Sequence, residues 1–144
     1  MGKKPLYNII VEGWIEDTPK HVSEKGRWCY IITDSDYNVI SKGNNKNAPN
    51  SATTTQRMTF IALLEALKAL NKEDVRIHVY TNSIHLMAVI YHKAKRLDKV
   101  MSAMINEYND LAKTLFVRGY LIKRAAKPFQ QAFKYYWEET KPNE

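Results

Sequence analysis

The order of strand-like and helix-like segments is the feature that most constrains the fold of this chain. Three apolar, β-branched stretches precede the first helix-like stretch, and strands and helices alternate after it. In chain order we predict strands 6–15, 27–33 and 37–42, a helix from about 54, strand 75–81, helices 83–95 and 97–113, strand 115–122 and helix 128–140. An antiparallel meander followed by parallel additions satisfies this order. We therefore expect an α/β fold, with a mixed five-stranded sheet and helices on both faces.

The first predicted helix carries two adjacent stripes of different size. Large apolar side chains recur at helical spacing at Phe60, Leu63, Leu64, Leu67 and Leu70. Small side chains recur beside them at Thr59, Ala62, Ala66 and Ala69. Thr53 and Gln56 have the spacing of a capping box at the start of this helix. The small stripe permits close approach to a sheet, so we expect the helix to pack against one.

The length of 144 residues is typical of one compact domain, and we expect a single domain over 1–144 with flexible ends at 1–5 and 141–144. The stretch 43–52, rich in Gly, Asn, Pro and Ser, is expected to be a loop. No apolar run reaches the roughly 18 residues of a membrane span, and the first residues do not resemble a signal peptide. The single cysteine, Cys29, excludes an intrachain disulfide. We expect a cytoplasmic protein with no membrane partner.

The positive charge of the chain is concentrated in one region. The net charge is +7, and residues 91–134 hold ten Lys or Arg against three acids, whereas the other residues hold twelve of each. A localised positive field attracts polyanions, which makes nucleic acid the first candidate partner. An anionic membrane, an acidic protein and simple solubility are alternatives that charge alone leaves open.

Three short motifs follow one another along the predicted elements. They are Val11-Glu12-Gly13 in the first strand, Thr54-Thr55-Gln56-Arg57-Met58-Thr59 at the first helix, and Tyr80-Thr81-Asn82-Ser83 at the end of the fourth strand. With these motifs and the element order, the chain resembles the type I ribonuclease H family over nearly its whole length. The resemblance implies a ribonuclease H-like fold and recognition of an RNA:DNA hybrid or another duplex through its backbone. It also implies hydrolysis with two divalent metal ions.

The resemblance further implies four carboxylates, and most of them are replaced here. The family has an Asp before the glycine of the first strand, a Glu after the Arg-Met pair, and an Asp between Thr and Ser on the fourth strand. These positions hold Glu12, Thr59 and Asn82. A fourth family Asp, near the start of the terminal helix, would fall where the sequence reads Gln130, Gln131 and Ala132. At most one of the four anions remains.

The loss of these anions bears directly on the chemistry. Two divalent cations about 4 Å apart repel each other, so clustered carboxylates must hold them. Thr59 offers a neutral hydroxyl and Asn82 a carbonyl oxygen, while Glu12 keeps its charge but adds a methylene. We therefore assign no catalytic residue and expect no resident cofactor. Mg²⁺ or Mn²⁺ would be needed only for residual nuclease activity. Glu12 is the candidate ligand for a single Mg²⁺, together with Asn82 and substrate phosphate.

Residues that bind nucleic acid can remain where catalytic ones are lost. By resemblance, Gly13, Thr54, Thr55 and Gln56 are expected to approach the nucleic-acid backbone, and a helix N-terminus with small polar side chains suits phosphate. The basic segment between the middle helices resembles the protrusion with which some family members grip DNA. The predicted basic contacts are Lys93, Lys95, Arg96, Lys99, Lys123, Arg124 and Lys127. Ordinary helix capping and solvated helix ends are the competing explanations.

The function expected from the sequence is nucleic-acid binding by a basic, ribonuclease H-like pseudoenzyme. Two alternatives stay open: a protein-interaction scaffold on the same fold, and an active metal-dependent hybrid endonuclease with non-standard ligands. Tyr135, Tyr136 and Trp137 form an aromatic cluster on the terminal helix. This cluster could stack on bases, contact a protein partner or a second copy of the chain, or pack in the core.

Overall fold

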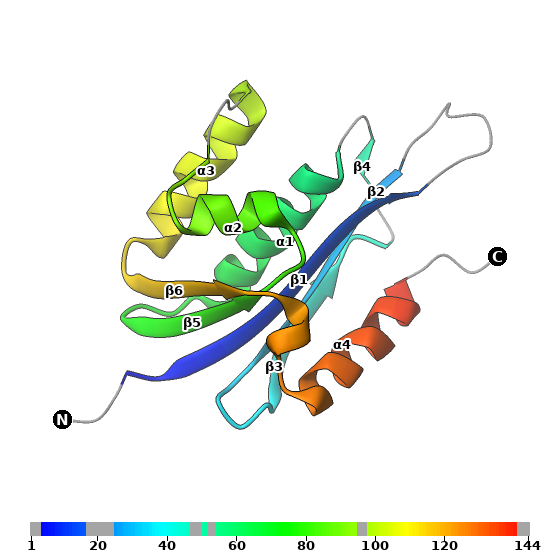
Figure 1. Cartoon of the computed structure of the whole chain (residues 1–144), viewed down its shortest axis with the longest axis vertical. Helices are drawn as coiled ribbons and strands as arrows, with labels where there is room; N and C mark the ends of the chain where they lie inside the picture. Colours follow the sequence, from blue (N-terminus) through cyan, green and yellow to red (C-terminus); the bar gives the residue numbers. More distant parts are fainter. Residues whose placement is uncertain (1–3, 17–24, 47–49, 52–53, 95–97, 141–144) are drawn as a thin grey trace.

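The computed structural model describes residues 4–16, 25–46, 50–51, 54–94 and 98–140, which form one sheet with helices on both faces (Figure 1). The strands are β1 (Leu6–Glu16), β2 (Lys25–Thr33), β3 (Val39–Asn44), β4 (Asn50–Ser51), β5 (Val75–Tyr80) and β6 (Leu115–Tyr120). The helices are α1 (Thr55–Leu70), α2 (Ile84–Ile90), α3 (Lys99–Ala112), the 3₁₀ turn η1 (Ile122–Arg124) and α4 (Lys127–Thr140). The strand order is β3-β2-β1-β5-β6, with β4 paired to β2 off this path. The predicted mixed sheet is confirmed, and β4 is added to it.

β1 lies at the centre of the sheet and joins its antiparallel and parallel halves. It pairs antiparallel with β2 and parallel with β5. β3 continues the antiparallel half, and β6 continues the parallel half. Ile9, Ile10 and Val11 of β1 are each 0% exposed. A central strand covered on both faces needs apolar residues at consecutive positions, which explains the run of three apolar residues at the middle of β1.

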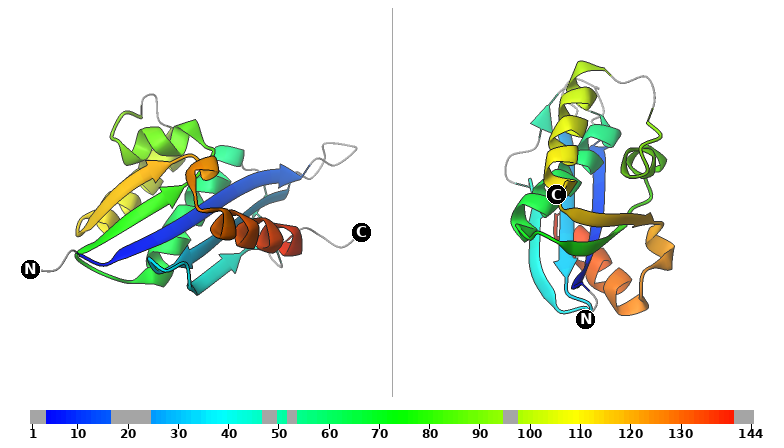
Figure 2. Two further views of the ribbon diagram at one scale, coloured as in Figure 1. Left: turned by 60° about the horizontal axis from the view of Figure 1, so that its bottom comes forward. Right: turned by 90° about the vertical axis from the view of Figure 1, so that its left-hand side faces the viewer.

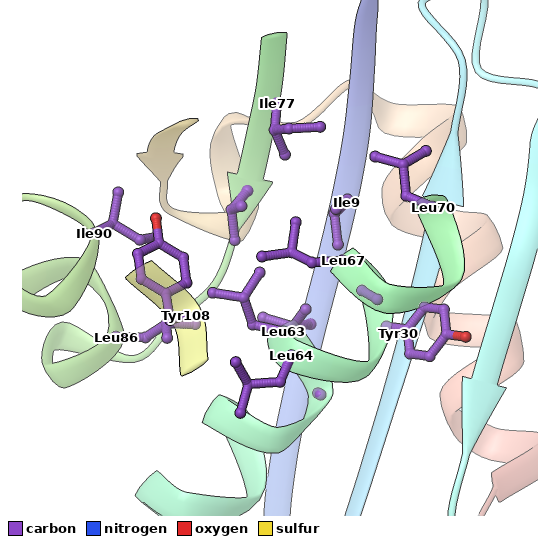
Figure 3. Close-up of a cluster of buried hydrophobic side chains, with 14 of the residues drawn as sticks. Ile9, Tyr30, Leu63, Leu64, Leu67, Leu70, Ile77, Leu86, Ile90 and Tyr108 are labelled. Atoms are coloured by element: carbon purple, nitrogen blue, oxygen red, sulfur yellow. The ribbon is translucent and has the colours of Figure 1, made fainter. Parts of the chain in front are cut away.

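One face of the sheet is covered by α1, with α2 and α3 beside it (Figure 3). The predicted large apolar stripe of α1 is buried against Ile9 of β1 and Ile77 of β5. Thr54 caps the helix, since its hydroxyl oxygen accepts a hydrogen bond of 3.2 Å from the backbone N of Arg57. Thr53, which we predicted in this role, lies outside the described residues. The helix ends at Leu70, and its C-cap Asn71 adopts a left-handed conformation with φ of 47°.

The opposite face is covered by α4 over the β1–β2 half of the sheet (Figure 2). Phe129 and Phe133 are buried there with Ile10 of β1. Of the aromatic residues at 135–137, Tyr136 is buried, and its hydroxyl oxygen accepts a hydrogen bond of 2.8 Å from Asn44. The Trp137 ring centroid lies 3.9 Å from that of Trp14. Two members of the predicted aromatic cluster therefore hold α4 to the sheet, whereas Tyr135 is 74% exposed.

The loop predicted at 43–52 is wrong in two places. Gly43 and Asn44 belong to β3, because they continue to pair with Tyr30 and Cys29 of β2. β4 falls within the same predicted loop. The start of β3 also moves, from the predicted residue 37 to Val39. Tyr37 adopts a φ of 64°, in a turn that the Asp34 carboxylate organises by accepting hydrogen bonds from the backbone N of Asp36 and Asn38.

The helix predicted at 83–95 is also shorter in the structure and ends at Ile90. The Tyr91 hydroxyl donates to the carbonyl oxygen of Gly119 at 3.0 Å and accepts from its backbone N at 2.9 Å, which fixes the chain against β6. His92 then adopts a φ of 58°, incompatible with a continuing helix. None of the helices in the described stretches is long and apolar enough to cross a bilayer.

Lys4 and Pro5, the described part of the end predicted at 1–5, form hydrogen bonds with β5. The carbonyl oxygen of Lys4 accepts a hydrogen bond of 3.1 Å from Arg76 Nε, and that of Pro5 accepts one of 2.8 Å from the backbone N of Arg76. The Pro5 bond continues the backbone bonding between the chain and β5 by one residue before β1, whereas the Lys4 bond comes from the Arg76 side chain. Residues 1–3 and 141–144, the rest of the predicted flexible ends, lie outside the described residues.

Candidate functional site

The fold brings together the residues of the three sequence motifs. Glu12 lies on β1 and points to the same side as Trp14, towards α4. Thr59 lies in the second turn of α1, and Asn82 follows the end of β5 directly. Glu12, Thr59 and Asn82 line one pocket, so positions far apart in the sequence converge where β1, α1 and β5 meet.

Gly13 explains how Thr59 comes so close to Glu12. A Cβ atom on Gly13 would lie 2.2 Å from the backbone N of Thr59 and 2.5 Å from the carbonyl carbon of Met58. Real Cβ atoms do not approach backbone this closely, so only glycine allows α1 to pack at this distance from β1. The predicted small stripe contributes through Thr59, Ala62 and Ala66, all buried, whereas Ala69 is exposed.

Two adjoining pockets share Glu12 and Asn82 and together form a groove. The first, of about 370 Å³, lies towards α1 and is also lined by Thr55, Gln56, Thr59, Ser83, Ile84 and His85. The second, of about 360 Å³, lies towards α4 and is also lined by Ile122, Gln130, Gln131, Phe133, Lys134 and Trp137. We call the two together the central groove. Glu12 is the only acidic residue among the described residues that line it.

Glu12 sits in an unfavourable electrostatic environment. Burial raises the pKa of its carboxyl group above the ordinary value, although a hydrogen bond from the backbone of Gly13 opposes this shift. The nearby Cys29 is buried, and burial together with the charge of Glu12 raises the pKa of its thiol. A carboxylate that a nearby cation compensated would have a lowered pKa instead.

Two of the other family positions, Thr59 and Gln130, use their polar groups within the protein. The Thr59 hydroxyl donates to the carbonyl oxygen of Thr55 at 3.0 Å, and Thr59 is 2% exposed. Gln130 Nε2 donates to the carbonyl oxygen of Ala125 at 2.6 Å and to that of Lys123 at 3.3 Å, which holds η1 to the start of α4. Asn82 is exposed, between Thr81 and Ser83, which hold the turn through a 3.0 Å bond from Ser83 N to the Thr81 hydroxyl oxygen.

The residues present do not fit the pair of divalent ions that the family resemblance implies. Such a pair needs several anionic oxygens converging on it. In the described stretches, no three or more His, Cys, Asp or Glu side chains are grouped so that they could hold a metal ion. The groove offers one carboxylate, one exposed amide at Asn82, and a Thr59 hydroxyl already used within α1.

The predicted binding residues divide into several groups. Thr55 and Gln56 are exposed and line the central groove. Thr54 is exposed and caps α1, whereas Gly13 is buried beneath it. Lys93 is exposed after α2, and Lys99 is exposed at the start of α3, next to the Asp98 that contacts Arg57 of α1. Lys95 and Arg96 lie outside the described residues. Lys123, Arg124 and Lys127 are exposed around η1 and the start of α4, near the opposite wall of the groove. Exposed bases therefore lie beside the α4 wall of the groove, and Lys99 follows the residue that contacts the start of α1.

Sequence reasoning missed a contact that joins α1 to α3. Arg57 Nη2 lies 3.0 Å from Asp98 Oδ2, and the other carboxylate oxygen of Asp98 accepts a hydrogen bond of 2.7 Å from Met101 N. These two bonds lower the pKa of Asp98, the backbone bond more than the side-chain bond. Asp98 is thus the N-cap of α3, which we had started at 97. An Asp directly before an apolar helical pattern was the available signal.

His85 and Lys134 also line the central groove, although sequence analysis gave them no role there. His85 is exposed on the first turn of α2, and Lys134 is exposed on α4. Neither residue belongs to one of the three sequence motifs. They line the groove because α2 and α4 pack beside the sheet, which a sequence pattern does not display.

The comparisons with known proteins agree with this fold. The sequence of residues 18–127 matches a family described as RNase H. LC11-RNase H1, isolated from compost and solved in complex with an RNA/DNA hybrid, is 16% identical, with a TM-score of 0.64 over 84% of this chain and 89% of that chain. RNase H1 from Halobacterium salinarum NRC-1 is 11% identical, with a TM-score of 0.63 over 88% of this chain and 89% of that chain.

LC9-RNase H1, described as a type 1 RNase H with the type 2 active-site motif, is 13% identical, with a TM-score of 0.69 over 94% of this chain and 72% of that chain. Among curated protein sequences, none matches this chain significantly. At these identities, the structural likeness establishes the fold.

Proposed function

This chain belongs to the RNase H family, and on that premise we propose that it binds RNA:DNA hybrid through the sugar–phosphate backbone and is impaired in hydrolysis. The observation that carries the proposal is the makeup of the central groove. The groove occupies the place where the resemblance predicts a metal centre, yet Glu12 is its only acid among the described lining residues. A groove that cannot hold two divalent ions but keeps exposed polar side chains and basic flanks suits binding better than cleavage.

The exposed start of α1 supplies the contacts expected for a backbone phosphate. Thr55 and Gln56 present a hydroxyl and an amide beside helix N–H groups that carry partial positive charge. These groups contact phosphate and sugar rather than base edges, so they favour binding without sequence preference. The hybrid as the preferred polymer is supported by the related LC11-RNase H1, solved with one.

The basic residues near the groove would contact backbone phosphates of a duplex that extends beyond it. Lys123, Arg124 and Lys127 are exposed beside the α4 wall, and Lys99 is exposed next to the Asp98 that contacts the start of α1. Lys93 is exposed after α2 and is a further candidate contact. Among these residues, salt dependence would reveal how many contact phosphate, because each neutralised phosphate releases counterions.

A salt titration of hybrid binding tests the first half of the proposal. We expect log Kd to rise steeply and linearly with log salt, and Lys123→Gln to reduce the slope by roughly 0.7–0.9. Lys25→Gln, which removes the same charge from the exposed start of β2, is the matched control and should leave the slope unchanged. A flat titration would contradict the proposal and favour the protein-interaction scaffold.

A cleavage assay tests the second half. Hybrid incubated with the protein in Mg²⁺ or Mn²⁺ should remain intact at concentrations that saturate binding. Cleavage that disappears in Glu12→Ala would contradict the proposed impairment.

That result would favour the second candidate, a nuclease with one metal ion. Its support is that Glu12 and Asn82 line both halves of the central groove, where they could share a cation with substrate phosphate.

A further inference from the structure

A further pocket, distinct from the two that form the central groove, lies on the sheet. It has a volume of about 480 Å³ and is lined by Lys4, Arg76, His78, Phe116, Val117 and Arg118. These residues come from the chain before β1 and from β5 and β6. α4 packs over the β1–β2 half of this sheet face and reaches the parallel half only at its far end, where Tyr80 contacts Phe129 and Tyr120 packs nearby (Figure 2). The lining residues of this pocket lie before that end of β5 and β6. We call this the β5–β6 pocket.

The strand register explains why its charges gather. Arg76 pairs with Phe116, and His78 with Arg118, in adjacent parallel strands. Side chains two residues apart on a strand share a face, so Arg76, His78, Phe116 and Arg118 form a square on the sheet surface. The alternate residues Val75, Ile77 and Val79 are buried on the opposite face. The same alternation that builds the core thus places two arginines and a histidine side by side.

The positive charges that line the pocket have few acidic side chains to neutralise them. No acidic residue is found among its described lining residues. Lys4 forms an ion pair with Asp74, which is not one of the residues that line the pocket. Arg76 donates from Nε to the Lys4 carbonyl oxygen, an uncharged acceptor, and Arg118 has no ion pair with any described acid. The pKa of the His78 imidazole is lowered, first by burial and then by the charges of Arg76 and Arg118.

An aromatic surface lies beside these charges. Phe116 is 54% exposed, unusual for a phenylalanine on a sheet, and the Lys4 ammonium lies 5.0 Å from its ring centroid. On the other side of the pocket, the Tyr120 ring centroid lies 5.0 Å from that of His78. An exposed ring in the same pocket as two arginine side chains offers both a stacking surface and charged donors.

We propose that the β5–β6 pocket binds a nucleotide unit, with its phosphate on Arg76 and Arg118 and its base on Phe116. The charge of the pocket selects an anion, and the neighbouring exposed ring selects an anion that carries a planar group. The pocket is separate from the central groove. Glu12 lies four residues beyond Asn8, the β1 neighbour of His78, which places it about 13 Å further along the strand.

An NMR titration of the full chain with a 5′-phosphorylated dinucleotide tests this proposal. We expect amide shifts clustered at Arg76, Phe116 and Arg118. Arg118→Glu should weaken binding about tenfold or more, because a charge-assisted contact is replaced by repulsion. Lys25→Glu makes the same change of charge at the far end of the sheet and should leave the affinity within about twofold of wild type.

Further probes separate the two halves of the site and its competing occupants. Phe116→Ala should weaken the dinucleotide about fivefold or more and leave binding of inorganic phosphate unchanged, since only the base stacks. Equal weakening by Arg118→Glu and Lys25→Glu, no dinucleotide binding, or equally tight binding of a polyglutamate peptide would overturn the proposal. Gln56→Ala should weaken hybrid but not the dinucleotide, so failure here is distinguishable from failure of the proposed function.

Discussion

At the residue scale, the glycine at position 13 has two possible explanations, a close packing contact and an approach to nucleic acid. The family resemblance gives it a place near the nucleic-acid backbone. In the structure it is buried, and the space for its missing side chain is filled by the backbone of Met58 and Thr59. Backbone cannot rotate away as a side chain can, so this position tolerates no Cβ without moving α1.

We therefore expect Gly13→Ala to lower the free energy of unfolding by roughly 1–3 kcal/mol or more through overpacking. Gly119→Ala is the control, because its Cβ would meet the flexible Met87 thioether at 2.5 Å instead of backbone. Its cost should be smaller. Urea denaturation of the three proteins measures both values, and equal costs would contradict the explanation from backbone contact.

Glu12 gives a prediction that depends on pH. Its pKa is raised above the ordinary value of 4.5 in the folded protein, so the folded state binds the proton more tightly than the unfolded state. The stability gained from protonation is complete below pH 4.5 and is lost as pH rises through the higher folded-state value. Glu12→Gln carries no charge at any pH.

The variant should therefore be more stable than wild type at neutral pH, with a difference that shrinks as the pH falls towards 4.5. Denaturation curves from about pH 4 to pH 8 measure the difference. A constant difference over this range would show that volume or hydrogen bonding, rather than charge, causes it.

At the element scale, the start of α1 combines a cap with a binding surface. Thr54 is the N-cap, and the next two residues line the central groove. These two roles make different demands, since capping needs a side-chain acceptor and phosphate binding excludes a negative charge.

Two substitutions of Thr54 separate these roles. Thr54→Ala should cost about 1 kcal/mol of stability, because the Arg57 N–H loses its acceptor. Thr54→Asp should keep the cap and the stability but weaken hybrid binding by repelling phosphate. Thermal unfolding and hybrid titration of both variants provide the measurements. A destabilised Asp variant, or one that binds hybrid as well as wild type, would contradict this separation.

At the scale of the whole molecule, the fold brings together three positions at which the family resemblance predicts metal ligands. β1, α1 and β5 still bring positions 12, 59 and 82 to one pocket. The triple variant Glu12→Asp/Thr59→Glu/Asn82→Asp would place three carboxylates there. Like charges in a partly buried site repel one another, so the folded state of this variant should be destabilised when no cation is bound.

We expect the melting temperature of this triple variant to be below that of wild type in EDTA and to rise on addition of Mg²⁺. Wild-type protein should show no such rise. Differential scanning calorimetry with and without Mg²⁺ makes the comparison. A wild-type protein that Mg²⁺ stabilises as strongly as the variant would contradict our description of the groove.

The sequence by itself determined the element order, the apolar stripe of α1 and the loss of three of the four predicted anions. Each of these depends on residue identity or on spacing within one segment, which a sequence displays directly. Element ends were less predictable, because α2 stops where Tyr91 bonds to Gly119 on a strand 28 residues away. Only the tertiary structure placed Thr55 and Gln56 beside Glu12, joined Arg57 to Asp98, and set Arg76 and Arg118 around one pocket. These contacts arise when a helix packs on a sheet or two strands align in register, and that packing depends on the whole chain at once.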